Sequence, residues 1–381
     1  MKKLQGIIIF LSALALLTVG LGCGEKKAST PKIGSVLRLS IGSEHGIPSK
    51  RGVLMAVDEF NKAGGLNGKK VEVVFEDEKD SPTAAVNAVK KLIDVDKVVA
   101  MVGPMTSGAT LAAYKDADEA KVVMISPPAT SPKVSGASPY LFRGCSRIDT
   151  QSKALTDYIA ATYKPKTVAI FYSNEPYGKG CAKVFGDDFE KLGIKKVAEE
   201  SFNRGDRDFK AQLTKIKEAN PYILFIPGYT PETAPAASQA RQLGLNQRIV
   251  GVYGDMDPEY AKLAGPAAEG HLIAGEYDED YDTPKNKKFR EEYYQEAKAA
   301  KEPVNIMFAA LLYDSTGLVL EAMKKNGPTS DGIKKFLNEV KDYDGVTGKL
   351  SFNKTNDVVR SGTESGVYLF EIKNGKYVKV K

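Results

Sequence analysis

Two hydroxyl side chains, Ser107 and Thr130, follow apolar runs of the kind that form buried strands. The runs are Val98–Val102 and Val122–Ile125, and a helical pattern lies between them. A β-α-β unit of this kind brings both turns to the carboxyl edge of a parallel sheet, where helix N-termini offer unpaired N–H groups to anions. The pattern therefore predicts a site for a small carboxylate beside Ser107 and Thr130.

Two simpler explanations compete with a ligand site. Gly103 and Gly108 have the spacing of a P-loop, but Ala109 stands where the phosphate-binding lysine would be, which disfavours a nucleotide site. Ser107 could also do no more than cap the helix that follows it. The turn Ser126–Thr130 favours a ligand site, because two strand ends then offer hydroxyl groups together.

Composition limits the classes of function. The 381 residues are enough for two domains, and 42% of them are hydrophobic. The net charge is +6 from 54 basic and 48 acidic residues, without a long basic run, so nucleic-acid binding is not predicted. The chain has no GxSxG, no HExxH and no GxGxxG opening a helix. We therefore expect neither enzymatic activity nor a cofactor.

The first 23 residues are predicted to be an export signal. Two lysines precede the apolar run Ile7–Val19, which is too short for a comfortable membrane span. Leu21-Gly22-Cys23 resembles a bacterial lipoprotein cleavage box, although Gly20 stands where leucine is usual. The charges, small residues and proline of residues 24–32 predict a tether. We expect an exported protein, in the periplasm or at the cell surface, lipid-anchored through Cys23 or cleaved nearby.

Cys145 and Cys181 are the cysteines of the body that follows the tether, and the sequence leaves open whether they pair. The spacing of these two cysteines is not that of a metal-binding motif. The two histidines, His45 and His271, are far apart in the chain. A zinc site is therefore not predicted.

Strands and helices alternate along most of the chain. Val36–Gly42 and Val71–Phe75 are predicted strands that precede the unit described above, and Ser43–Pro48 is a predicted loop. A second alternating region has predicted strands at Thr167–Phe171, Tyr222–Ile226, Arg248–Val252 and His271–Ala274. This alternation predicts an α/β protein with two doubly wound, parallel-sheet lobes.

Polar and aromatic residues follow the strands of the second region as well. They include Tyr177, Tyr229, Tyr253 and Asp255, all at the carboxyl edge of the predicted sheet. Two such edges that face each other form a cleft, which is a common place for a small-ligand site.

After a helical stretch that begins at Thr283, the chain returns to strands. Asn374-Gly375 lies between apolar runs and predicts a hairpin. Such a return predicts several crossings between the lobes and hence a hinge. The predicted first lobe comprises residues 33–148 and 279–365, and the second comprises 149–278 and 366–381.

The assembled pattern resembles the periplasmic-binding-protein type I family, specifically the branched-chain amino acid (Leu/Ile/Val) binding proteins of ABC transporters. The resemblance covers nearly the whole mature chain and rests on the order and spacing of several motifs. These are Gly52–Gly68, Val102–Thr110, Ser126–Thr130, Phe142-Arg143, Tyr177–Gly180, Gly228-Tyr229, Ala268–Gly270 and Gly345–Gly348.

The resemblance implies that the protein holds an amino acid between its lobes. Ser107 and the N–H of Thr130 would bind the α-carboxylate, while the Pro128 carbonyl and the Thr130 hydroxyl would receive the ammonium. Tyr177 and Tyr229 would close over the ligand. The neighbours that complete the implied site are Met105, Thr106 and Ala129.

The chain departs from the family pattern in three places. The loop Ser43–Pro48 is short and lacks the usual Pro–Leu/Phe–Ser/Thr–Gly segment. His45 falls near the place of a pocket tyrosine and is either a ligand contact or a solvated histidine. The acidic partner of the ammonium aligns with Tyr253, so Asp255, or less well Asp257, would have to replace it. If neither does, the ligand is an amide, a carboxylate or an aromatic compound.

The resemblance also implies a role. Hinge closure around the ligand would create the surface that a membrane permease recognises, and the bound ligand would not be altered. A ligand-sensing subunit of a membrane receptor would use the same cleft, so it stays open as an alternative.

Overall fold

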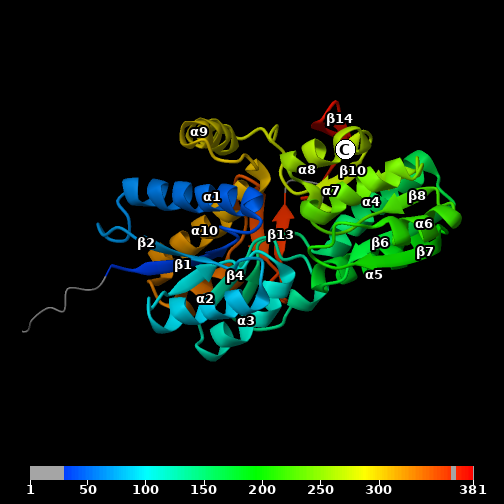
Figure 1. Cartoon of the computed structure of the whole chain (residues 1–381). Helices are drawn as coiled ribbons and strands as arrows, with labels where there is room; N and C mark the ends of the chain where they lie inside the picture. Colours follow the sequence, from blue (N-terminus) through cyan, green and yellow to red (C-terminus); the bar gives the residue numbers. More distant parts are fainter. Residues whose placement is uncertain (1–29, 362–365, 381) are drawn as a thin grey trace, which may run out of the picture. The chain divides into compact units, whose positions relative to one another are not determined.

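The computed structural model describes residues 30–361 and 366–380, and its first sheet is built from five parallel strands (Figure 1). The strands are β1 (Lys32–Leu37), β2 (Glu72–Asp77), β3 (Ala100–Val102), β4 (Val123–Ser126) and β5 (Leu141–Arg143). Their order in the sheet is β2-β1-β3-β4-β5. The order reverses between β1 and β3, so a crevice opens at the carboxyl ends of these two strands.

The second sheet repeats this order and adds two strands. It contains β6 (Thr167–Ser173), β7 (Lys195–Phe202), β8 (Ile223–Phe225), β9 (Arg248–Val250), β10 (Leu272–Gly275), β14 (Tyr368–Lys373) and β15 (Lys376–Lys379). The order β15-β14-β10-β9-β8-β6-β7 places its crevice between β6 and β8. Because β14 and β15 are antiparallel to their neighbours, this sheet is mixed, whereas the sequence predicted a parallel one.

Helices cover both faces of the first sheet. In Figure 1, α1 and α10 lie on one face, and α2 and α3 lie on the other. The helices of this lobe are α1 (Ser43–Lys62), α2 (Pro82–Asp94), α3 (Ser107–Glu119), α9 (Pro284–Ala300), α10 (Ile306–Asn326) and α11 (Ser330–Glu339). In the described part of the chain, only α10 has the length and apolar composition of a membrane span. Its most apolar stretch is 89% buried, which is typical of a core helix.

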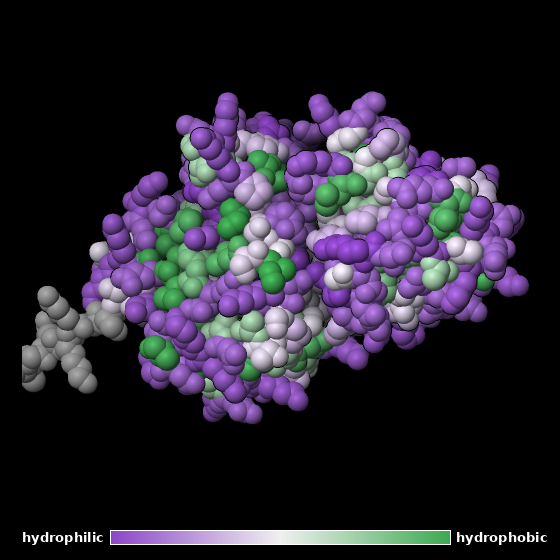
Figure 2. Space-filling view, viewed as in Figure 1, coloured by the Kyte–Doolittle hydropathy of each residue, from purple (hydrophilic) through white to green (hydrophobic). Residues whose placement is uncertain are grey.

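The second sheet is covered in the same way. The helices of this lobe are α4 (Ile148–Tyr163), α5 (Pro176–Lys191), α6 (Lys210–Glu218), α7 (Thr230–Gln242) and α8 (Pro258–Ala264). Apolar residues of α4 and α5 share one buried cluster with the sheet, and those of α6, α7 and α8 share another. On the face drawn in Figure 2, hydrophilic residues predominate, and hydrophobic ones gather beside the first sheet. Cys145 and Cys181 are both buried and free, so the pairing that the sequence left open is not formed.

The largest error of the sequence-based prediction lies at the start of the chain's first helix. β1 begins at Lys32, which was assigned to the tether, and α1 begins at Ser43, so Ser43–Pro48 is helical and not a loop. Glycine and proline gave this segment the composition of a turn. Gly46 is needed inside the helix, because a Cβ there would lie 1.7 Å from the carbonyl oxygen of Arg38.

Other expected elements are present. The Asn374-Gly375 hairpin is confirmed: Lys373 pairs with Lys376, and both turn residues have positive φ, as such a two-residue turn requires. β7, with the sequence KKVAEESF, was not predicted. It lies at the sheet edge with mostly part-exposed or exposed residues, so it lacks the apolar run of a buried strand.

The chain passes between the lobes after β5, after β10 and after β13 (Val358–Ser361). β13 belongs to a small antiparallel sheet with β11 (Tyr343–Gly345) and β12 (Gly348–Phe352), and Figure 1 shows it standing between the two lobes. The sequence predicted several crossings between the lobes, and the order of the described elements agrees with it. That these connections act as a hinge stays a prediction.

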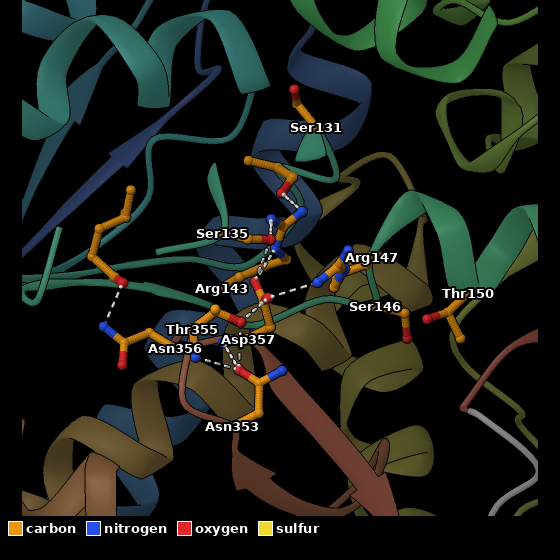
Figure 3. Close-up of polar contacts among 12 residues, drawn as sticks. Ser131, Ser135, Arg143, Ser146, Arg147, Thr150, Asn353, Thr355, Asn356 and Asp357 are labelled. Atoms are coloured by element: carbon orange, nitrogen blue, oxygen red, sulfur yellow. Dashed lines mark hydrogen bonds and ion pairs between the residues drawn. The ribbon is translucent and has the colours of Figure 1, made fainter. Parts of the chain in front are cut away.

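A buried ion pair joins this region to the turn after β4 (Figure 3). The Nε of Arg143 lies 2.8 Å from Oδ1 of Asp357, and both side chains are at most 1% exposed. Arg143 also donates to the Ala129 carbonyl at 3.1 Å and to the Ser135 hydroxyl at 2.7 Å. The pair therefore fixes the turn that carries Thr130 against the segment that leads into β13.

We expect Asp357→Ala to lower the free energy of unfolding by about 3–5 kcal/mol, because it leaves the Arg143 guanidinium buried without its partner. Urea unfolding followed by circular dichroism measures this. The matched control is Asp149→Ala, whose pair with Arg147 is exposed and which should cost less than about 1 kcal/mol. Equal, small losses in both variants would show that the buried pair does not hold the crossing.

Candidate ligand-binding site

A small cavity lies where the carboxyl edges of the two sheets face each other. The first lobe lines it with Arg38, His45, Met105, Thr106, Pro128 and Phe308. The second lobe lines it with Tyr177, Tyr229, Tyr253 and Gly254. Its volume of about 10 Å³ is close to the space of one water molecule. A ligand of amino-acid size can therefore enter only if the lobes move apart.

Seven of the eleven residues predicted for the site line this cavity. They are His45, Met105, Thr106, Pro128, Tyr177, Tyr229 and Tyr253. Ser107, Ala129 and Thr130 do not line it but are buried in the adjoining strand-end turns. The Ser107 hydroxyl accepts the N–H of Ser131 at 3.3 Å. The Thr130 hydroxyl has no hydrogen-bond partner among the described residues, so it is available to a ligand.

Asp255 does not take the position proposed for it. One carboxylate oxygen accepts the Thr233 hydroxyl at 2.5 Å, and the other lies 3.5 Å from Nε2 of His271. Burial raises the pKa of Asp255 above its ordinary value, although the contacts with His271 and Thr233 act to lower it. Both oxygens of the Asp255 carboxylate therefore contact residues inside the second lobe. Asp255 does not line the cavity, so it is not placed to bind an ammonium group there.

His45 is a pocket residue and not a solvated loop histidine. It is 1% exposed, and its ring stacks on Phe308 with centroids 4.4 Å apart. Its Nδ1 lies 3.1 Å from Nη1 of Arg38, and its Nε2 lies 3.4 Å from Oδ2 of Asp257 in the other lobe. Arginine can only donate, so Nδ1 accepts and the ring proton sits on Nε2, facing Asp257.

The same histidine decides whether a metal ion suits the site. Ligand atoms of Glu44, His45 and Asp257 lie within 4.8 Å of one another. A metal would need the lone pair of Nε2, which carries the proton as long as Nδ1 accepts from Arg38. The group therefore suits a hydrogen bond between the lobes better than a metal. Burial raises the pKa of Asp257, but the contacts with His45 outweigh it and the pKa falls below its ordinary value.

Arg38 is the main site residue that the sequence analysis missed, together with Gly254 and Phe308. Its side chain follows β1, is 1% exposed, and lies with its guanidinium carbon 5.4 Å from the ring centroid of Tyr229. A charged residue at the end of an apolar run, Val36-Leu37-Arg38-Leu39, was a signal that could have identified it.

A buried carboxylate holds the loop before α3. Glu78 accepts the N–H groups of Met105 at 2.8 Å and Thr106 at 3.3 Å. Burial raises the pKa of Glu78 to about 7, although these N–H groups and Arg38 act to lower it. The loop that carries Met105 and Thr106 is therefore coupled to a group that titrates near neutral pH.

Comparison with known proteins identifies the fold and the family. Residues 31–376 match the periplasmic binding protein family. The chain belongs to this family. One relative of this binding protein is the leucine-, isoleucine-, valine-, threonine- and alanine-binding protein of Pseudomonas aeruginosa, which is 30% identical over 319 residues, with 83% of each chain covered.

Two solved structures agree with this binding protein along most of its length. The leucine binding protein LivK from Thermotoga maritima has a TM-score of 0.85 at 30% identity and covers 92% of this chain and 98% of its own. LivJ from Streptococcus pneumoniae, solved in complex with isoleucine, has a TM-score of 0.82 at 36% identity and covers 92% of this chain and 99% of its own. The predicted family and type I fold are confirmed.

We expect Glu78 to give this binding protein a pH-dependent stability. Its carboxyl has an ordinary pKa of 4.5 and a folded pKa of about 7, so the folded state holds the proton more tightly. Stability should therefore fall as the pH rises through that window, by about 3 kcal/mol from this group. Glu78→Gln should remove this fall, which urea unfolding at about pH 4.5 and about pH 7.5 measures. If the free energy of unfolding of the wild type and that of the variant differed by the same amount at both pH values, the raised pKa of Glu78 would be contradicted.

Proposed function

We propose that this protein is the substrate-binding component of an ABC importer and binds an amino acid, branched-chain or related, between its lobes. Family membership and relatives named for leucine, isoleucine and valine support this role. The observation that carries it is that loops after β1, β3 and β4 of one sheet and after β6, β8 and β9 of the other meet at one cavity. The ligand would be delivered to a membrane permease.

The proposed contacts use groups that suit an amino acid. Ser107, at the first turn of α3, and the N–H of Thr130 hold the α-carboxylate. The Pro128 carbonyl and the free Thr130 hydroxyl receive the ammonium. Tyr177 and Tyr229, with ring centroids 5.0 Å apart, cover the ligand from the second lobe.

Contacts across the cleft favour the closed arrangement. Asp80 of the first lobe is bound by Arg204 of the second, and the Arg204 guanidinium lies 4.4 Å from the ring centroid of Tyr229. The rings of Tyr253 and Phe308 add an apolar contact with centroids 5.4 Å apart. We propose that the lobes divide near residues 148, 278 and 366 and open there to admit the ligand.

Export and anchoring complete the proposal. The signal at residues 1–23 and the lipidation site Cys23 lie outside the described residues and rest on the sequence alone. A periplasmic binding protein works outside the cytoplasmic membrane, which agrees with such a signal. We propose that a lipid on Cys23 tethers the protein near its permease.

A ligand without an ammonium group is the second candidate. None of the lining residues of the described cavity carries a carboxylate. By the family resemblance, Tyr253 stands where the acidic partner of the ammonium is expected. A carboxylate or an aromatic acid would need no such partner. Calorimetry that compares amino acids with their deaminated analogues separates the two candidates.

Ser107→Ala should weaken amino-acid binding by about 1–3 kcal/mol, because it removes a buried hydrogen bond to a charged group. Isothermal titration calorimetry of the refolded, ligand-free protein with leucine, isoleucine, valine and related amino acids measures this. Ser238→Ala, in α7 of the second lobe, is the matched control and should leave the affinity unchanged. Absence of binding by any amino acid would contradict the proposed function, and an unaltered affinity of Ser107→Ala would remove Ser107 from the site.

A further inference from the structure

Arg38 gives the cavity a charge that a branched-chain amino acid cannot use. Among the lining residues that the structure describes, it alone carries a permanent charge, and the others are aromatic, apolar or neutral polar. Its side chain is 1% exposed. A buried guanidinium is retained at low cost only when its N–H groups are paired.

The guanidinium presents a free edge. Nη1 is engaged with Nδ1 of His45 at 3.1 Å, whereas Nε and Nη2 have no hydrogen-bond partner among the described residues. These two nitrogens form the side of the planar fork that binds one carboxylate through two parallel hydrogen bonds. The unpaired edge therefore matches a carboxylate group.

Asp80 is the intramolecular competitor for this edge. Its Oδ2 lies 3.5 Å from Nη2 of Arg38, beyond a good hydrogen bond, and the same oxygen is bound by Arg204 from the second lobe. Arg204 thus holds Asp80 in the closed form, so that Asp80 balances part of the charge of Arg38 without occupying its Nε.

A glycine next to the Arg38 guanidinium leaves room for it. Gly42 has a φ of +74°, and a Cβ there would lie 2.0–2.2 Å from Nη2, Cζ and Nε of Arg38. Only glycine fits at this position with the guanidinium in place. The position of the Arg38 guanidinium is therefore fixed by two neighbours: His45 contacts Nη1, and Gly42 lies against the guanidinium.

We propose that Arg38 binds a second carboxylate of the ligand and that the preferred ligand is an amino acid with an acidic side chain. The inference rests on the proposed function, since the α-carboxylate is assigned to Ser107 and Thr130. The side-chain carboxylate pairs with Nε and Nη2. A leucine or isoleucine side chain at the same place leaves that edge buried and unpaired.

Glutamate and glutamine provide the sharpest test, because they differ only in the carboxylate or amide at the end of the side chain. In calorimetry, the wild-type protein should bind glutamate at least about 30-fold more tightly than glutamine. Arg38→Gln should reduce this preference to within about 3-fold, and Arg38→Lys should keep part of it. Arg248→Gln, at the β9–β14 side of the second lobe, is the matched control and should keep the full preference.

Thermal unfolding without ligand checks that each variant folds. If Arg38→Gln does not fold, Gly42→Ala provides the second variant, since it displaces the guanidinium without removing it and should also lower the glutamate preference. This ratio of two affinities does not change when a substitution only alters stability.

The outcomes separate this inference from the proposed function. Binding of leucine but not glutamate overturns the acidic ligand and leaves the proposed function standing. A glutamate preference that persists in Arg38→Gln overturns the role of Arg38. Binding of glutarate that depends on Arg38, without binding of any amino acid, supports the carboxylate contact but overturns the amino-acid ligand. No binding of any of these compounds overturns both proposals.

Discussion

The proposed site depends on one geometric constraint: the five parallel strands of each lobe have the same order, and their carboxyl edges face each other. In each sheet the order reverses between two strands, β1 and β3 in the first and β6 and β8 in the second. The loops that leave those strands cannot return over the sheet on the same side, so they diverge and leave a crevice. Each lobe supplies only one wall, and the proposed binding site is complete only where the two crevices meet.

The second constraint is the cost of burying charge in that cleft. His45 and Asp80 belong to one wall, and Asp257 and Arg204 belong to the other. The closed form therefore has two contacts that neither lobe can form alone, His45 with Asp257 and Asp80 with Arg204. These contacts offset the desolvation of the groups only in part, because two nitrogens of Arg38 and the hydroxyl of Thr130 stay unpaired. A ligand that pairs with them stabilises the closed form specifically, and this differential affinity couples binding to hinge motion.

Much of the fold could be predicted from the sequence, because the alternation of apolar runs and helical patterns is a local property. Most predicted strands exist within a few residues of the expected bounds, and the turns with Ser107 and Thr130 do lie at strand ends. The start of α1 was missed, because the need for Gly46 arises from a contact with the Arg38 backbone that no local pattern records.

The orientation of site residues was harder to predict. Asp255 and Asp257 are two positions apart, yet Asp255 contacts Thr233 within its lobe and Asp257 reaches His45 in the other lobe. The direction of each side chain is set by the 3-10 turn Tyr253–Asp255 and by its packing, which the spacing of the residues does not reveal. Arg38 is marked in the sequence by its place in an apolar run, but its burial and its unpaired nitrogens appear only in the structure.

The distance between the lobes, measured by pulsed electron resonance with one spin label on each lobe, tests the account most directly. Lys90 in α2 and Lys183 in α5 have exposed side chains and suit replacement by cysteine in a Cys23→Ser background, while Cys145 and Cys181 are buried. Closure of the lobes around the ligand predicts a long, broad distance distribution without ligand and a shorter, narrow one with saturating glutamate or leucine. The same distribution in both conditions, with binding established by calorimetry, would contradict closure of the lobes around the ligand.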